Sequence, residues 1–178
     1  ESLESTKVSS ELISFIETES NVLLPIVLGS CIPQNCPLNH KFDGSFTIGK
    51  QDKDQLVNKA LLYLNAPYLW GGKTTFGIDG PGFTQMTYKT NGYRLLRGAQ
   101  QQSTQGEALS FIEESEPGDL AFFDNNDGTI DHVGIIMENN YVIHSFGKVR
   151  IDRIDHTGIF NTETNTYTHK LRVIKKII

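Results

Sequence analysis

The spacing of apolar residues changes along the chain, and this change predicts the order of its elements. Leu56, Ala60 and Leu64 recur at helical intervals, and a second helix is expected over residues 81–88. Beyond Gly92 the apolar residues fall into short runs separated by turn residues, which predicts strands. The expected strands are residues 119–123, 132–137, 141–145, 149–152 and 169–177. Helices followed by an antiparallel meander predict an α+β domain over residues 52–178.

Residues 1–51 follow a different pattern. Residues 5–17 have weak helical spacing, residues 22–28 form an apolar run typical of a strand, and residues 31–49 are rich in turn formers. No complete apolar core is expected within this segment. We therefore interpret residues 1–51 as an N-terminal arm or the remnant of a small β domain.

Composition and charge exclude two classes of protein. The chain has 178 residues, of which 38% are hydrophobic and 21% charged, enough apolar material for a packed core. A net charge of −5 argues against a nucleic-acid binder that works by neutralising phosphates. No apolar run approaches the ~18–20 residues of a membrane span, and Pro25 interrupts the longest one. Because the chain begins at Glu1 rather than Met, we expect a trimmed or processed product, so that any export signal lies outside this sequence.

The two cysteines, Cys31 and Cys36, leave the redox compartment undecided. They are close enough in sequence to form a small disulfide in an oxidising compartment or to remain as two thiols. A zinc site is not expected from them, because no second pair of cysteines or histidines lies at ligand spacing. We expect neither a metal nor a cofactor.

Five short motifs stand in one order between Tyr68 and His144. They are residues 67–72 (PYLWGG), 76–83 (FGIDGPGF), 117–120 (PGDL), 132–134 (HVG) and 143–145 (IHS). This series resembles the NlpC-type family of cell-wall cysteine peptidases over about residues 52–178. The resemblance implies a papain-like fold in which helices pack on a small antiparallel sheet, with a cleft between the helix at Pro81 and the strand bearing His132. It also implies that the arm is a remnant of the small β-barrel domains that precede the peptidase domain in many relatives.

The resemblance further implies a function in the bacterial cell wall. Members of this family cut peptidoglycan stem peptides, usually between D-γ-glutamate and a diamino acid, so the implied location is the cell envelope, periplasmic or secreted. In these enzymes a cysteine opens this helix, at the position that Gly80 occupies here. A helix N-terminus and a neighbouring imidazolium lower the thiol pKa enough to yield a thiolate nucleophile.

The other site roles are carried over position by position. The resemblance makes His132 the general base and His144 the residue that orients it. Tyr68 matches a tyrosine near the oxyanion and the substrate. Asp79 matches an acid that holds the free amine of the stem peptide in some relatives. Pro81 and Trp70 complete the expected substrate-binding side.

The sequence departs from the family signature at the nucleophile. Gly80 occupies the cysteine position and Pro81 the adjacent serine position, so no thiol or hydroxyl is available there. The helix start is nevertheless kept, because glycine is acceptable at an N-cap and proline is favoured at the first helical position. Neither arm cysteine shows a helix start that would ionise it, and Thr84 lies a helical turn inward.

Each candidate residue also has a structural explanation. His132 and His144 are also typical of half-buried strand histidines, although two of them at matching family positions favour a retained pocket. A metal role for them lacks a third ligand at a telling spacing. Asp79 is a suitable helix cap, and Tyr68 and Trp70 are suitable core aromatics, with Trp70 expected to pack under its loop. The remaining histidines and one charged strand are expected at the surface: His40, His156 and His169, and the charges of residues 148–153.

Three functions follow from these patterns. The first is a peptidase-like domain without its nucleophile that binds a stem peptide or a protein partner. The second is a working cysteine endopeptidase for the γ-D-glutamyl-diamino acid bond, inactivated here by substitution at Gly80. The third is a purely structural or interaction module whose cleft is filled.

Overall fold

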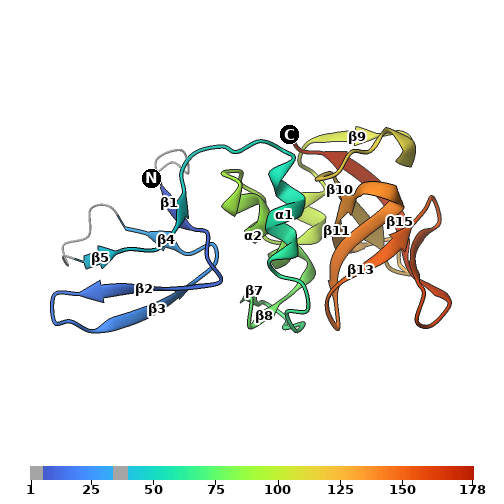
Figure 1. The fold of residues 1–178 in the computed structure, drawn as a ribbon. Coiled ribbons are helices and arrows are strands. Elements are labelled where there is room, and N and C mark those ends of the chain that lie inside the picture. The colour runs from blue at the N-terminus through green and yellow to red at the C-terminus, as the bar shows by residue number, and fades with distance from the viewer. Residues whose placement is uncertain (1–5, 34–39) are drawn as a thin grey trace.

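The computed structural model describes residues 6–33 and 40–178. Its helices are α1 (Gln55–Leu61), α2 (Gly80–Thr90) and α3 (Ala99–Gln102), with two 3-10 turns, η1 (Ile112–Glu114) and η2 (Glu138–Asn140). The two helices expected from apolar spacing are therefore present as α1 and α2. They lie side by side between the arm and the large sheet (Figure 1).

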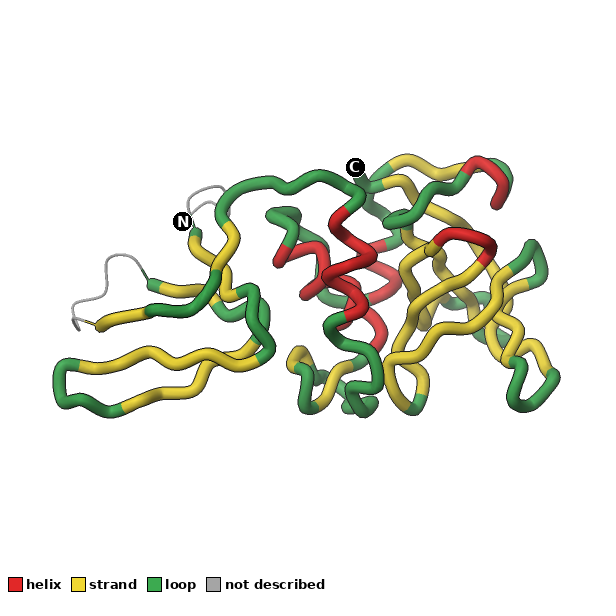
Figure 2. Tube along the Cα trace, viewed as in Figure 1, coloured by secondary structure: helices red, strands yellow, loops and turns green. Residues whose placement is uncertain are grey.

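The predicted strands belong to one antiparallel sheet that closes on itself. In spatial order its strands are β10 (Leu120–Asp124), β11 (Ile130–Met137), β12 (Tyr141–Phe146), β13 (Lys148–Ile154), β14 (Gly158–Asn161), β15 (Thr166–Lys176) and β9 (Glu107–Leu109). Closure follows because β10 pairs with both β11 and β15 (Figure 2). The α+β prediction is confirmed, whereas β9, β14 and α3 were not predicted.

Closure gives the sheet two buried faces. Leu120 and Phe122 pack into the larger core between the sheet and the helices, while Ala121 and Phe123 pack into a second core inside the closed sheet. Successive side chains of a strand point to opposite faces, so a strand buried on both sides is apolar at every position. The continuous run Leu-Ala-Phe-Phe in β10 therefore reflects this double burial.

The arm consists of short strands and contains no helix among its described residues. Its strands are β1 (Lys7–Ser9), β2 (Ile13–Thr18), β3 (Leu23–Val27), β4 (Cys31–Ile32), β5 (His40–Phe42) and β6 (Phe46–Thr47), arranged in two three-stranded sheets. The helical expectation for residues 5–17 is wrong as far as they are described, because β2 pairs with β3 and β5. The expected strand over residues 22–28 is present as β3. The expectation of turns alone over residues 31–49 is wrong where β4, β5 and β6 form.

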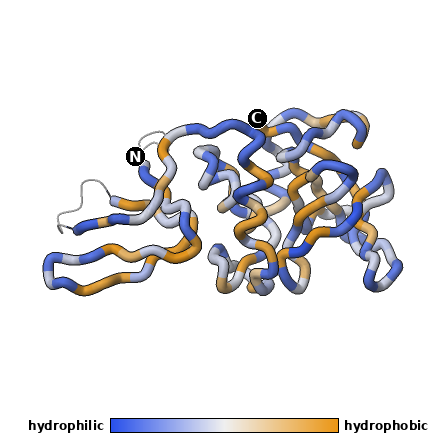
Figure 3. The backbone as a smooth tube through the Cα atoms, viewed as in Figure 1, coloured by the Kyte–Doolittle hydropathy of each residue, from blue (hydrophilic) through white to orange (hydrophobic). Residues whose placement is uncertain are grey.

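The arm is continuous with the main core. Leu28 is fully buried and belongs to the core between helices and sheet. The Thr47 hydroxyl donates to the carbonyl of Thr90 at the end of α2, at 3.0 Å. The β2–β3 hairpin, by contrast, leaves large apolar side chains such as Phe15 and Leu23 exposed. In Figure 3 its two strands carry orange stretches, whereas the turn that joins them is blue.

None of the helices within residues 6–33 and 40–178 combines the length and apolar character needed to cross a bilayer.

Two buried tyrosines of the main core provide a matched stability test. The Tyr88 hydroxyl donates to the Gly118 carbonyl at 2.6 Å, whereas the buried Tyr63 hydroxyl has no hydrogen-bond partner among the described residues. Tyr88→Phe is expected to lower the free energy of unfolding by about 1–3 kcal/mol, because it strands a buried carbonyl. Tyr63→Phe is expected to be neutral or stabilising. Urea denaturation of both variants tests this, and an equal loss in both would contradict it.

Candidate functional site

The start of α2 is held by Asp79. Its Oδ1 accepts from the Gly82 backbone N–H at 2.7 Å, which caps the helix, and Pro81 occupies the first turn. The same carboxylate accepts from the Gly71 backbone N–H at 2.8 Å, so it also ties down the preceding loop. The structure thus shows the capping role that the sequence left open for Asp79.

Arg97 occupies the rest of the Asp79 carboxylate. Its two terminal nitrogens donate to Oδ1 at 2.9 Å and to Oδ2 at 2.7 Å, a bidentate ion pair. Asp79 is almost fully buried, while the Arg97 side chain is partly exposed. Four donors therefore already surround the Asp79 carboxylate, and the charge of Arg97 balances its own. Asp79 is not left as an unpaired acid for a ligand amine.

Gly80 faces the ring of His132. A Cβ placed on Gly80 would lie 3.5 Å from His132 Nδ1 and 3.7 Å from the Val133 carbonyl, which is ordinary van der Waals contact. The backbone at this position therefore has room for a side chain directed at the imidazole. With glycine at this position, no side-chain atom lies opposite His132 Nδ1.

His132 belongs to a buried hydrogen-bond relay. Its Nε2 lies 2.9 Å from His144 Nδ1, and His144 Nε2 lies 2.9 Å from Asp152 Oδ2. An ionised carboxylate only accepts, so His144 donates from Nε2 and its Nδ1 must accept from His132. The proton of neutral His132 is thereby placed on Nε2. Its Nδ1 keeps a bare lone pair that points at Gly80, which is the orientation of a general base.

Asp152 is itself held by Arg150. The guanidinium donates through Nε and Nη2 to the two carboxylate oxygens, at 2.6 and 2.9 Å. Asp152 is 4% exposed, so the expectation that the charges of residues 148–153 lie on the solvent side is wrong for this residue. Alternation along β13 was the available signal, because it places Asp152 on the same interior face as Ile154.

Burial and hydrogen bonding decide the charge states of the relay. Burial lowers the pKa of His132 well below its usual value, and the nearby His169 and His144 rings lower it further. Burial also lowers the pKa of His144, although its bond to Asp152 acts in the opposite direction. Burial raises the pKa of Asp152, but hydrogen bonds from His144 and Arg150 outweigh this and leave it below the usual value. Both histidines are therefore neutral and Asp152 is ionised at neutral pH.

Strand register brings the relay together. Gly134 lies opposite His144 across the β11–β12 pair, and His144 lies opposite Arg150 across the β12–β13 pair. A Cβ at Gly134 would lie 2.6 Å from a methyl group of Val142 and 3.0 Å from the His144 Cβ. Glycine is thus required at Gly134 for the close approach that lets His144 reach His132.

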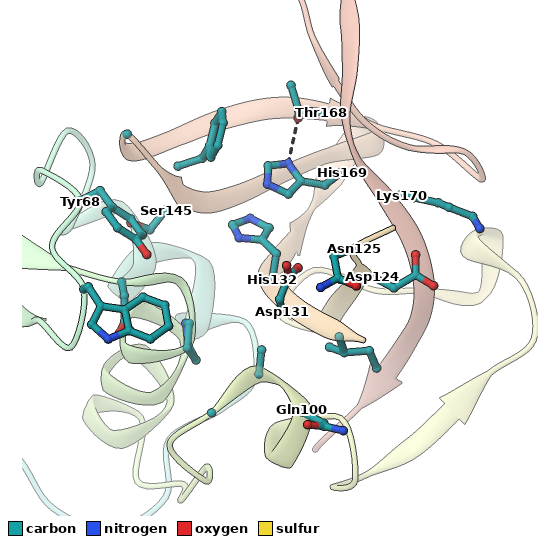
Figure 4. Close-up of a pocket in the computed structure, with 18 of the residues that line it drawn as sticks. Tyr68, Gln100, Asp124, Asn125, Asp131, His132, Ser145, Thr168, His169 and Lys170 are labelled. Atoms are coloured by element: carbon teal, nitrogen blue, oxygen red, sulfur yellow. Dashed lines mark hydrogen bonds between the residues drawn. The ribbon is translucent and has the colours of Figure 1, made fainter. Parts of the chain in front are cut away.

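A cleft of about 1450 Å³ lies in front of His132 and is lined by four of the expected site residues besides it: Tyr68, Trp70, Asp79 and Pro81. His144 is fully buried and contacts His132 from behind. Trp70 is 85% exposed, so its expected packing under the loop is wrong. In Figure 4 Tyr68 and Ser145 lie on one side of His132, with Asp124 and Asn125 on the other.

The structure brings to this cleft a histidine that sequence reasoning placed at the surface. His169 was expected at the surface, but its ring stacks on His132 with centroids 4.0 Å apart and an interplanar angle of 23° (Figure 4). Burial lowers its pKa to about 4. The signal was again alternation, because His169 lies two residues before Leu171, which packs against the inner core.

Other hydroxyls near the cleft are already engaged. The Ser145 hydroxyl donates to the Ile78 carbonyl at 2.9 Å, and the buried Thr84 hydroxyl lies 2.7 Å from Gln102 Oε1. Cys31 is an exposed free thiol on β4 of the arm, and Cys36 lies outside the described residues. Among the described residues, no cysteine lines the cleft.

Comparison with known proteins identifies related sequences. The model of the NlpC/P60 family matches residues 65–169, more than half of the chain. A gamma-D-glutamyl-L-lysine dipeptidyl-peptidase of Bacillus cereus is 32% identical over 150 residues, covering 76% of this chain and 45% of that protein. The protein of the same name from Bacillus subtilis is 34% identical over 98 residues, covering 54% of this chain and 33% of that protein. The chain thus spans less than half the length of these relatives.

Solved structures show the same fold. An NlpC/P60 family protein from Bacillus cereus superposes with a TM-score of 0.79 at 23% identity, covering 98% of this chain and 64% of that one. RipD from Mycobacterium tuberculosis superposes with a TM-score of 0.56 at 19% identity, covering 72% of this chain and 99% of that one. RipD is described as a non-catalytic NlpC/p60 domain protein adapted to a peptidoglycan-binding function. At these identities the likeness extends to the fold alone.

The Asp79 cap is testable by stability. Asp79→Ala is expected to lower the free energy of unfolding by at least about 2 kcal/mol, because it removes the cap and leaves Arg97 unpaired. Asp79→Asn is expected to cost less, since one amide oxygen still accepts from Gly82. Asp54→Ala is the matched control, because Asp54 precedes α1 but makes no capping hydrogen bond. Chemical denaturation measures the stability of all three variants. If Asp79→Ala is as stable as Asp54→Ala, the capping role of Asp79 is refuted.

Proposed function

Because this chain belongs to the NlpC/P60 family, we propose that it is a peptidoglycan-peptidase-like domain that binds a cell-wall stem peptide without cleaving it. A protein partner in the same cleft is the alternative occupant. One observation carries the proposal: the position opposite His132 Nδ1 is Gly80, which has no side chain. Without a nucleophile, an amide cannot be opened by covalent attack.

The loss of the nucleophile is expected to abolish useful turnover. Removing the nucleophile of such a triad leaves only about 10³–10⁴-fold acceleration over water, from binding and oxyanion groups. The hydroxyls of Ser145 and Thr84 are committed to other partners and do not replace it. RipD, described as a non-catalytic NlpC/p60 domain protein, is an example of this fold serving peptidoglycan binding.

The cleft itself keeps the features of a binding site. It remains open, and its rim carries the exposed rings of Tyr68 and Trp70. Aromatic side chains of this kind supply large contact areas at low entropic cost. Because Arg97 saturates Asp79, recognition of a free peptide amine is expected to depend on other acids of the cleft, such as Asp124 or Asp131. A stem-peptide ligand implies that the protein works in the cell envelope.

A second function is favoured by a specific observation. The relay behind His132 is complete, and a Cβ at Gly80 meets no obstruction. These features are equally those of a cysteine endopeptidase for the γ-D-glutamyl-diamino acid bond that has been inactivated by substitution at Gly80. The natural coding sequence decides between them: cysteine and serine codons at positions 80 and 81 would establish the second function.

Restoring the nucleophile tests the catalytic half of the proposal. The unaltered chain is expected to show no turnover of muropeptides above background. Gly80→Cys, alone or with Pro81→Ser, is expected to raise hydrolysis by at least about 10³-fold, because the new thiol would lie beside His132 and at the N-terminus of α2, both of which favour the thiolate. Gly80→Ala, which fills the same space without sulfur, is the matched control. Clear cleavage by the unaltered chain would overturn the proposal.

Direct binding tests the other half. Calorimetry with L-Ala-γ-D-Glu-diamino acid peptides is expected to show saturable 1:1 binding. Trp70→Ala is expected to weaken it by about tenfold or more, as truncation of an exposed aromatic anchor does. Phe111→Ala is the matched control, because Phe111 is exposed but does not line the cleft. If no peptide binds but a protein partner does bind in the cleft, the alternative occupant is established. If neither binds, the cleft has no ligand of this class.

A further inference from the structure

Three histidines converge at one end of the closed sheet. His132, His144 and His169 come from β11, β12 and β15, and one ring nitrogen from each lies within 4.8 Å of the other two. The sequence argued against a metal because a third ligand was not apparent, and the fold brings that third ligand to the other two. Imidazole nitrogens are preferred ligands of Zn²⁺, Cu²⁺ and Ni²⁺.

We propose that His132, His144 and His169 form a binding site for one divalent transition-metal ion. The ligating atoms are Nε2 of His132, Nδ1 of His144 and Nε2 of His169. This site is separate from the attack position, because Gly80 lies at the opposite nitrogen of the His132 ring. The proposal does not depend on whether a peptide binds in the cleft.

Two of the three rings are already oriented by outer partners. His144 donates its other nitrogen to Asp152, which is held in turn by Arg150. A carboxylate behind a ligating histidine fixes its tautomer and increases its basicity, an arrangement common around zinc. If an ion bound to His144 Nδ1, the hydrogen bond from His144 to Asp152 that supports it would already be in place.

His169 is oriented by a hydroxyl. Its Nδ1 lies 2.9 Å from Thr168 Oγ1 (Figure 4), and that hydroxyl is also 3.5 Å from the Ile159 carbonyl. Because the hydroxyl donates to the carbonyl, it accepts from His169 Nδ1–H, and His169 Nε2 is left with a free lone pair.

Binding an ion requires a small movement of His132 and His144 and a larger movement of His169. Ligands about 2.0–2.1 Å from a tetrahedral ion are roughly 3.3 Å apart. The His132–His144 nitrogens, now 2.9 Å apart, must separate by a few tenths of an ångström, and the His132 proton must move from Nε2 to Nδ1. His169 must tilt out of its stack on His132, since two nearly parallel rings cannot point at one ion.

Charge state and access are suitable for an ion. All three pKa values are lowered by burial, so the rings are neutral and need not lose a net proton to bind. His132 and His169 line the cleft while His144 is buried, so an ion would be reached from the cleft and keep its fourth position open on that side.

The test uses the full chain, free of affinity tags, with Cys31→Ser and Cys36→Ser to remove competing thiols. ZnCl₂ titrated into metal-free protein by calorimetry is expected to bind at one equivalent. His169→Phe, which keeps a ring in the stack but removes its nitrogens, is expected to weaken affinity by at least about 100-fold, and Asp152→Asn by about 10–100-fold. His156→Gln, which removes an exposed histidine, is the matched control and is expected to bind as the parent does.

A second measurement is independent of variant folding. X-ray absorption of the zinc-loaded parent is expected to show three imidazole nitrogens and no sulfur. The proposal is overturned if the parent does not bind zinc, if a folded His169→Phe protein binds as tightly as the parent, or if fewer than three imidazoles are counted. Peptide calorimetry on the metal-free protein separately decides the proposed function.

Discussion

The antiparallel register of β11, β12 and β13 is the constraint on which the site depends. It places His132, His144 and Asp152 on the interior face of a closed sheet, where His132 is hydrogen-bonded to His144 and His144 to Asp152. A shift of one residue in either pairing would turn these side chains to the opposite face. Gly134 maintains the register locally because a larger residue would push the two strands apart. The direction of the His132 lone pair is therefore a consequence of sheet geometry.

The start of α2 does not depend on a side chain at position 80. Asp79 caps α2 and ties down the preceding loop through backbone N–H groups, and neither contact involves the side chain of the next residue. The helix start is therefore intact with glycine at position 80. Under the proposed function, this independence lets the chain keep the architecture of its family while the cleft serves binding.

The arm and the main domain are connected by packing as well as by the chain. Leu28 enters the core beneath the helices, and Thr47 bonds to the end of α2. The boundary expected at residues 51 and 52 therefore describes the sequence pattern better than it describes the core. The β2–β3 hairpin, which precedes Leu28 in the chain, is held mainly by its own backbone pairing, since many of its apolar side chains face outward.

Local sequence was sufficient for α1, α2 and most strands of the large sheet. It also offered Asp79 as a cap, a role that only the structure decided, and it paired His132 with His144 through a family resemblance. These features depend on periodicity and on short motifs, which are properties of neighbouring residues. Asp152 and His169 were assigned to the surface, and Trp70 to the core, because the inner and outer sides of a strand or loop are defined only once the sheet has closed. β15 returns to pair with β10, and that long-range pairing buries His169 against His132. Sequence determined which residues could do chemistry here, and tertiary structure decided which of them meet, because contact between distant strands depends on closure and register.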